Sequence, residues 1–131
     1  MLEYRVEHKD DYYDTLCEWW DLWKFPRVSK SSLPNCIFVV NNCGVDVYAI
    51  PVYFSDSDFC WIAFVTGNKL APKKLRDGSL SFLLLSVENH IKDLGVRLCI
   101  TVNGNKSLDK LYVDSGYIVS GRNVNEYVKI L

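Results

Sequence analysis

Apolar and polar positions alternate with two different periods along the chain, and the changes of period divide it into strands and helices. Leu2 to Glu7 alternates residue by residue, as a half-buried strand does. Asp10-Asp11 then opens a predicted helix, because acidic side chains suit the positive end of the helix dipole. Pro26 ends this helix, and the polar Arg27 to Asn35 predicts a loop with at most one helical turn. The apolar face of the helix is aromatic and has helical spacing: Tyr12, Leu16, Trp19, Trp20 and Trp23.

Three runs rich in β-branched and aromatic residues follow in the middle of the chain. They are Cys36 to Asn42, Val45 to Ser55 and Phe59 to Val65. Short segments with turn-forming residues separate them, which predicts an antiparallel meander. Pro51 lacks a backbone donor and therefore indicates a bulge or an edge position in the second run. The polar, lysine-rich Thr66 to Gly78 predicts a loop.

The second half returns to helical periodicity. Ser79 to Leu94 carries one apolar stripe at helical spacing, and Gly95 provides its C-terminal stop. Arg97 to Val102 is short and dense in apolar residues, as a buried parallel strand is. Ser107 to Ser115 predicts a last helix, closed by Gly116. Two final strands are expected at Tyr117 to Ser120 and Val124 to Leu131.

The predicted order is β, α, a three-strand meander, α, β, α, β, β. A strand, a crossover helix and a second strand form a right-handed parallel unit. We therefore expect an α/β (mixed α+β) fold: a mostly antiparallel sheet of six to seven strands with helices on both faces. With 131 residues, the chain is expected to form a single domain, residues 1–131.

Composition narrows the possible functions. The formal net charge of −1 argues against a nucleic-acid binder, which would carry a strongly basic face. No apolar run is long enough to span a bilayer, and no secretory signal is visible, so we expect a cytoplasmic protein without membrane contact. The cysteines are odd in number and form no C-x-x-C pair, which favours reduced thiols. His8 and His90 are the sole histidines and lie near no nucleophile motif, so neither zinc nor a Ser-His or Cys-His nucleophile is expected.

One stretch after the predicted Arg97 to Val102 strand carries a recognisable pattern. It reads Asn105-x-x-Leu108, then Leu111-Tyr112, then Gly116-Tyr117. This pattern resembles the last helix of the GCN5-related N-acetyltransferases (the GNAT superfamily), and the predicted order of elements is the order of that superfamily. The resemblance implies acetyl-CoA as cofactor and Tyr112 as the acid that protonates the leaving thiolate. Tyr112 would equally suit packing under the sheet, and Asn105 would either cap the helix or touch the cofactor.

The same resemblance points to a cofactor site on the fourth strand and the helix after it. The strand residues are Ile62, Ala63, Phe64 and Val65, and the pyrophosphate loop corresponds to Arg76-Asp77-Gly78-Ser79-Leu80-Ser81. Free N–H groups and the helix dipole attract phosphate at such a loop. Arg76 and Gly78 fit, whereas Ser79 and Ser81 stand where the superfamily has small glycine-type residues. The alternative is a solvated basic loop in which Asp77 or Ser79 caps the helix.

A general base is not evident. Many GNAT enzymes place a glutamate on the fourth strand, but Phe59 to Val65 contains no carboxylate. Asp56 and Asp58 precede this run, where turn formation is their expected role. Some members of the superfamily act through ordered water instead.

A further likeness is to small GNAT-like proteins of tailed bacteriophages. It is carried by Trp19-Trp20-x-x-Trp23 with Pro26, by Leu33-Pro34, and by Arg122-Asn123 before the final strand. Two hypotheses follow. The chain is an acetyl-CoA-dependent N-acetyltransferase acting on a small-molecule or protein amine, or it is a catalytically lapsed GNAT-fold protein that serves as a phage binding or virion-associated component.

Overall fold

The computed structural model describes residues 1–131, and its elements follow the predicted order up to the last helix. They are β1 Leu2–His8, α1 Lys9–Trp23, a 3-10 turn Lys30–Ser32, β2 Cys36–Asn42, β3 Val45–Phe54, β4 Phe59–Ile62, β5 Thr66–Gly67, α2 Lys73–Arg76, α3 Ser79–Asp93, β6 Leu98–Thr101 and α4 Lys106–Asp114. None of the helices has the length and apolar character that crossing a membrane requires.

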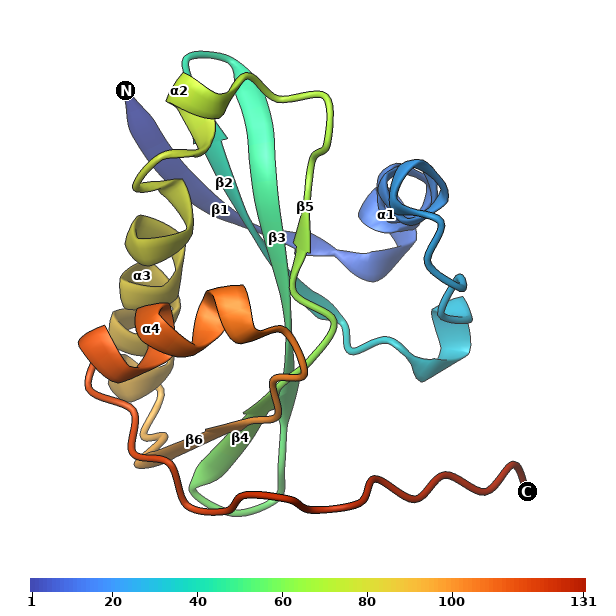
Figure 1. The fold of residues 1–131 in the computed structure, drawn as a ribbon, viewed down its shortest axis with the longest axis vertical. Coiled ribbons are helices and arrows are strands. Elements are labelled where there is room, and N and C mark those ends of the chain that lie inside the picture. Colours follow the sequence, from blue (N-terminus) through green and yellow to red (C-terminus); the bar gives the residue numbers. More distant parts are fainter.

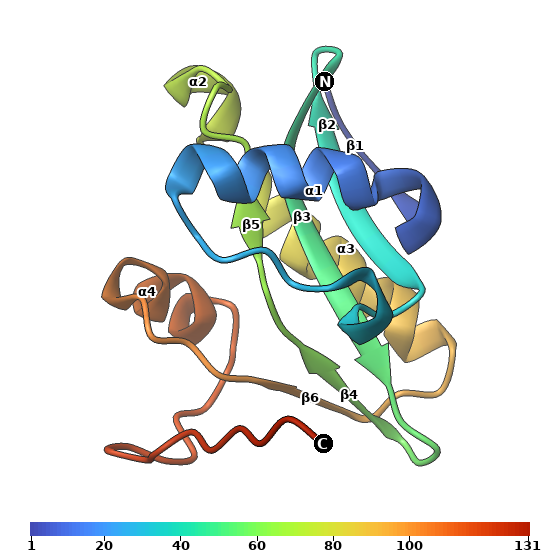
Figure 2. The same cartoon turned by 90° about the vertical axis from the view of Figure 1, so that its right-hand side faces the viewer.

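Six strands form one mixed sheet, in the order β1-β2-β3-β4-β6, with β5 also paired to β3. All neighbours are antiparallel except β4 and β6, which run parallel from Phe59 opposite Leu98 to Ile62 opposite Thr101. Helix α1 covers one face, and α3 and α4 cover the other (Figures 1 and 2). The predicted mixed sheet with helices on both faces is confirmed.

Each face of the sheet has its own core. Under α3, aliphatic side chains at helical spacing, among them Leu83 and Val87, pack on inward residues of β2, β3 and β4. Under α1, Trp19 and Trp20 pack on Ile37 and Val39 of β2 with Ala49 of β3. Period 3.6 in the helices and period 2 in β2 therefore place the apolar residues as the sequence pattern predicts.

The run Phe59 to Val65 is not one strand, as predicted: it forms the short β4 and then a bulge, which β5 follows. β4 ends at Ile62, residues 63–65 bulge out of the ladder, and pairing with β3 resumes in β5. Pro51 explains the break: its carbonyl accepts from the Ala63 N–H, so its missing donor faces the same side, towards the bulge. Pro51 indicated a bulge or an edge position, and the structure shows a bulge in the strand opposite it. The predicted loop Thr66 to Gly78 accordingly contains β5 and α2.

The two predicted last strands are not formed. Residues 117–131 contain no helix or strand, and β6 pairs on one side alone, with β4. The Tyr117 ring packs against Tyr112, and its hydroxyl lies 3.6 Å from Cys99 Sγ. After this anchor the chain runs extended to an exposed C-terminus (Figure 1). A β-prone sequence becomes a strand only where a ladder partner is placed beside it, and none is placed here.

Candidate functional site

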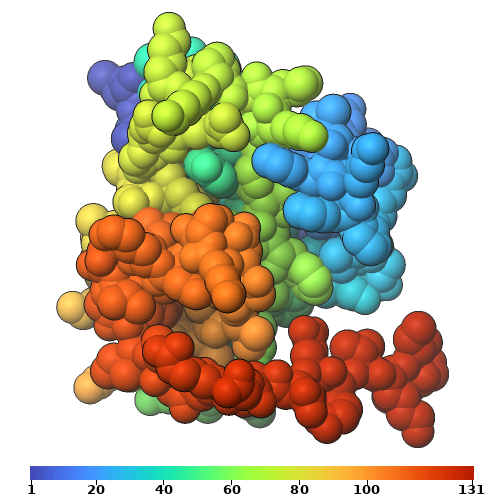
Figure 3. Space-filling view, viewed as in Figure 1, coloured from blue at the N-terminus to red at the C-terminus, as the bar shows by residue number.

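The sheet opens into a V where β4 and β6 part. Their pairing ends at Ile62 opposite Thr101, and the Thr101 hydroxyl donates to the Ile62 carbonyl at 3.1 Å as the last link between them. Beyond this point the chain after Ile62 stays beside β3, while the chain after Thr101 turns away into α4. Figure 3 shows the lime-green segment after β4 exposed between the orange α4 and the blue α1. The opening therefore leaves one edge of this segment without a neighbouring strand.

Two backbone donors of the bulge are unused. The N–H groups of Phe64 and Val65 have no acceptor in the protein, whereas the Ala63 N–H donates to Pro51. Phe64 holds its backbone in the left-handed region, at φ 57°. Such a conformation in a non-glycine residue persists only where the surroundings impose it.

A buried hydrogen-bond relay holds the bulge in this shape. The Trp20 indole N–H donates to Thr66 Oγ1 at 3.0 Å, and the Thr66 hydroxyl donates to the Phe64 carbonyl at 2.7 Å. One turn further along α1, the Trp23 indole N–H donates to the Gly67 carbonyl at 2.8 Å. Helix α1 therefore positions the bulge through directional bonds to β5.

Tyr112 lies on the α3 side of the opening. It is buried in the core shared with α3, and its ring meets Tyr117 edge-on with the centroids 5.3 Å apart. Burial raises the pKa of Tyr112, and the nearby Thr101 hydroxyl opposes this only in part. The phenol is therefore protonated at neutral pH, beside the residue that marks the end of β6 pairing. This environment suits a proton donor and suits a packed aromatic residue equally.

The N-terminus of α4 is closed. The Asn105 side chain accepts from the Ser107 N–H and from the Ser107 hydroxyl, and Asn103 donates to the Asn105 carbonyl. The predicted capping role of Asn105 is confirmed, and its side-chain oxygen is already engaged in the cap.

The N-terminus of α3 is open by contrast. Gly78 is its N-cap at φ 77°, a conformation that glycine adopts without strain, and it has no side chain to satisfy the first N–H groups. Ser79 is buried, and its hydroxyl donates back to the Leu75 carbonyl, so it does not cap the helix. Ser81 is exposed. Neither Asp77 nor Ser79 caps the helix, so the capping expected in the alternative of a solvated basic loop is wrong.

Three cationic residues precede this open helix end, and the exposed Asp77, directly before Gly78, adds a negative charge. Lys73 and Lys74 are exposed on α2, and Arg76 is its last residue. The Arg76 Nε atom is buried and has no hydrogen-bond partner in the protein. Burial raises the pKa of Tyr48; the positive charge of Arg76 opposes this, and the negative charge of Asp77 adds to it. Since Tyr48 pairs with Gly67 of β5, it links the helix end to the segment that holds the bulge.

The structure thus gathers the predicted site residues in two groups. Ile62, Ala63, Phe64, Val65 and Tyr112 border the opening of the sheet, and Arg76, Gly78, Ser79 and Ser81 surround the α3 N-terminus. Asn105 belongs to neither group, because its side chain caps α4. Sequence reasoning missed Thr101, Trp20 and Thr66, which join or brace the strands. The position of Thr101 at the end of a short predicted strand was the one available signal; this strand is parallel to β4 as predicted, but it is a half-exposed edge strand and not a buried one.

Asp56 and Asp58 lie in the turn between β3 and β4, as predicted. The Asp58 carbonyl accepts from the N–H groups of Arg97 and Leu98, so it ties the start of β6 to this turn. No carboxylate lies on β4 itself. The structure therefore supplies no general base on that strand.

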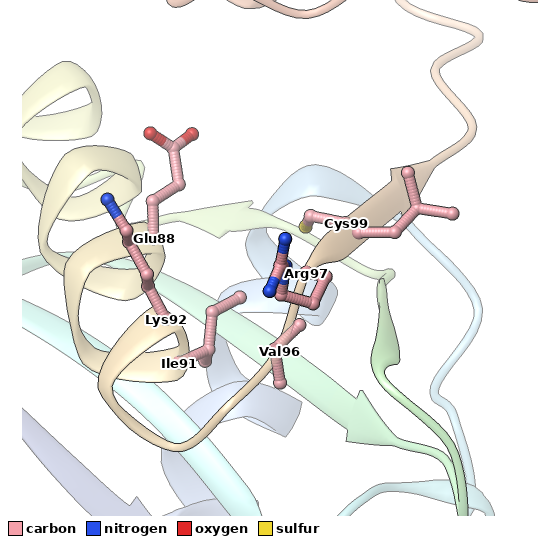
Figure 4. A pocket seen from close by; sticks show the side chains of 7 residues that line it. Glu88, Ile91, Lys92, Val96, Arg97 and Cys99 are labelled. Carbon is pink, nitrogen blue, oxygen red and sulfur yellow. The ribbon is translucent and has the colours of Figure 1, made fainter.

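A hollow of about 260 Å³ lies elsewhere, between the C-terminal half of α3 and β6 (Figure 4). Glu88, Ile91 and Lys92 line it from α3, with Arg97 and Cys99 from the other wall. Burial raises the pKa of Glu88, and the Tyr117 hydroxyl opposes this in part. The hollow is at the opposite end of α3 from Gly78 and contains neither the bulge nor Tyr112.

No family model matches the chain, and no curated protein matches it in sequence. Solved structures of GNAT acetyltransferases do match its fold over nearly the full length. A probable acetyltransferase, SA2161 of meticillin-resistant Staphylococcus aureus, is 14% identical with a TM-score of 0.72, covering 99% of this chain and 100% of that one. The acetyltransferase AAC(6')-Iy, in complex with a bisubstrate analogue of CoA, is 16% identical with a TM-score of 0.71, covering 100% and 99%. An aminoglycoside acetyltransferase from an uncultured soil metagenome, in complex with sisomicin, is 14% identical with a TM-score of 0.70, covering 99% and 97%. This chain has the GNAT fold.

Proposed function

We propose that this chain is an acetyl-CoA-dependent N-acetyltransferase in which Tyr112 protonates the leaving thiolate. The observation that carries the proposal is the opening of the sheet: β4 and β6 part after Ile62 and Thr101, the N–H groups of Phe64 and Val65 that follow Ile62 have no acceptor, and Tyr112 lies beside Thr101. An extended, amide-containing ligand binds such an edge as an added strand. The pantetheine arm of acetyl-CoA has this character.

The α3 N-terminus supports the same ligand. Its free N–H groups and the helix dipole favour a pyrophosphate, and the unpartnered Arg76 Nε is a buried donor beside them. Lys73 and Lys74 would add attraction from the surface. Ser79 offers no side-chain contact to a phosphate, because it is fully buried and its hydroxyl is bonded to the Leu75 carbonyl.

When bound, acetyl-CoA would supply the activated thioester. Tyr112 would donate its Oη proton to the thiolate as the C–S bond breaks and the new N–C bond forms. With no carboxylate on β4, water would accept the proton that the amine loses. Because its pKa is raised, Tyr112 would keep this proton at neutral pH until the thiolate leaves.

The alternative is a GNAT-fold binding protein without catalysis, including the proposed phage or virion-associated component. Two observations favour it: the Ser79 hydroxyl is turned inward, and β4 lacks a carboxylate. The acceptor amine and a cytoplasmic location are parts of the enzyme proposal, whereas the alternative would replace the acceptor with a protein partner.

Calorimetry with acetyl-CoA decides between them. We expect saturable heat and thermal stabilisation by acetyl-CoA, and less of both with Gly78→Asp than with Gly78→Asn, since the pair differs in charge at the helix end while both replace glycine at positive φ. Absence of heat and of stabilisation at millimolar acetyl-CoA would falsify the enzyme proposal. If acetyl-CoA binds, Tyr112→Phe should slow CoA release in a thiol assay at least tenfold with binding retained. An unchanged rate would remove Tyr112 from the mechanism.

A further inference from the structure

Two cysteines lie side by side on the parallel strands β4 and β6. Cys60 and Cys99 are register partners, and their sulfur atoms are 3.6 Å apart. Neighbouring strands of a sheet are about 4.8 Å apart, which is within the roughly 4.4 to 6.8 Å between Cα atoms that a disulfide spans. Both side chains belong to the core on the α3 face, and both are free thiols. Closing this pair to a disulfide therefore requires a shift of the two sulfur atoms and no change in strand pairing.

The two thiols differ in their access to solvent. Cys60 is fully buried, whereas Cys99 is partly exposed and lines the hollow between α3 and β6. Figure 4 shows Cys99 across this hollow from Glu88 and Lys92 of α3. A hollow of about 260 Å³ admits a reagent as small as hydrogen peroxide. Such a reagent therefore reaches Cys99 first, and Cys60 lies behind it.

Hydrogen bonds to the Cys99 sulfur favour its thiolate. The Cys60 thiol and the Tyr117 hydroxyl both donate to it, each at 3.6 Å. These donors lower the pKa of Cys99, although burial and the charge of Glu88 oppose them. The same bond to Cys99, together with burial, raises the pKa of Cys60. Since the thiolate is the reactive form, Cys99 is the nucleophile of the pair and Cys60 stays a protonated thiol.

The charged side chains of the hollow do not oppose a thiolate. Glu88 and Lys92 line it from α3, and Arg97 lines it from the other wall. Two cations therefore face one carboxylate beside Cys99. Burial raises the pKa of that carboxylate, which weakens its negative charge further.

We propose that hydroperoxides oxidise Cys99 and that Cys60 then closes a reversible disulfide with it. With hydrogen peroxide, the Cys99 thiolate attacks one oxygen and the O–O bond breaks. The leaving hydroxide takes up the proton that the Cys99 thiol gave up, so the products are Cys99 sulfenic acid and water.

In the second step the Cys60 sulfur attacks the sulfenic sulfur of Cys99. The S–S bond forms, the S–O bond breaks, and the hydroxyl group leaves as water with the Cys60 proton. The two thiols lose two electrons in all, and the peroxide accepts them. A dithiol reductant restores both thiols by exchange.

The test treats the reduced protein with a small molar excess of hydrogen peroxide, alkylates the remaining thiols and maps the peptides without reduction by mass spectrometry. We expect a Cys60–Cys99 cross-link with loss of two hydrogens from the intact mass, and recovery of both thiols in dithiothreitol. Cys36 is the internal control: it is half-buried, burial raises its pKa, and it should react at least tenfold more slowly than Cys99. Cys43→Ser removes the exposed thiol, which would otherwise link two chains.

Two results of this map would overturn the proposal. One is that Cys60 and Cys99 both remain reduced while Cys36 is oxidised. The other is that Cys99 proceeds to sulfinic acid without a link to Cys60. The measurement involves no acetyl-CoA, so its outcome is independent of the proposed acetyl transfer.

Variants separate the roles of the two cysteines. Cys60→Ala removes the second thiol, so Cys99 should stop at sulfenic acid and become labelled by dimedone. Cys99→Ala should leave Cys60 reduced, because that thiol is fully buried. Tyr117→Phe keeps the ring beside Tyr112 but removes a donor to Cys99, and it should slow oxidation about threefold. Equal dimedone labelling with and without Cys60, or oxidation of Cys60 in Cys99→Ala, would contradict the order of the steps.

Discussion

The two faces of the sheet are stabilised in different ways. One face contributes through burial, and the other also holds β5 and the bulge in place. The α3 face is an aliphatic core, in which Leu83, Leu84 and Val87 pack on strand residues without directional bonds. The α1 face is aromatic and hydrogen-bonded: Tyr12 donates to Asp46, Trp20 to Thr66 and Trp23 to Gly67. Aliphatic burial is non-directional, whereas a hydrogen bond fixes the relative placement of two groups. The α3 face therefore contributes through burial, whereas the α1 face also sets where β5 and the bulge lie.

The largest loss of stability is expected from a substitution in the core of the α3 face. Leu83 is fully buried, so Leu83→Ala should lower the free energy of unfolding by about 2 to 5 kcal/mol through lost burial and a residual cavity. Urea denaturation measures the change. Leu85→Ala removes the same atoms from the exposed side of α3 and should cost less than about 0.5 kcal/mol. Similar losses in both variants would contradict the assignment of the core face.

An intermediate effect is expected from Trp20→Phe on the α1 face. It removes the indole donor to Thr66 and should cost about 1 to 3 kcal/mol, while freeing the bulge to relax. Trp19→Phe is the matched control: Trp19 is nearly as buried and on the same helix, but its indole bonds to no protein acceptor. We expect acetyl-CoA affinity to fall in Trp20→Phe and to stay constant in Trp19→Phe. An equal affinity in the two variants would show that the relay does not position the bulge.

The smallest effect, and the one that depends on pH, involves Asp46. Burial alone would raise the pKa of Asp46, but hydrogen bonds from Arg5, Asn41 and Tyr12 outweigh it and lower the pKa below 3.8. A carboxyl whose pKa is lower in the folded state stabilises the fold above its unfolded pKa. That stability is lost as the pH falls through the folded value.

Asp46→Asn should therefore cost about 1 kcal/mol at pH 7 and progressively less towards pH 2. The free energy of unfolding of both proteins, measured in urea between pH 7 and pH 2, should converge at the acid end. A gap that stays constant with pH would mean that ionisation of Asp46 adds nothing to its hydrogen bonds.

Much of the candidate site was predictable because local rules govern it. Gly78 and the Arg76 to Ser81 segment lie at the N-terminus of a helix whose periodicity is unmistakable, and Asn105 caps α4 as its residue type favours. The bulge was not predicted as such, since Phe59 to Val65 is β-prone throughout. The break depends on Pro51 in the neighbouring strand and on Trp20 and Thr66 from elsewhere in the chain.

By itself, the sequence determined the order of the main helices and strands as far as α4, the buried faces of α1 and α3, and the mixed sheet that follows from a meander and a crossover helix. Periodicity and capping are local, so a single chain displays them directly. Tertiary structure alone decided which partner each strand edge received. It divided Phe59 to Val65 into β4 and the bulge, left residues 117–131 without a ladder, and placed Tyr112 in the core under α3 beside Thr101. Strand pairing and the apposition of distant side chains depend on contacts between remote segments, and no local pattern encodes these.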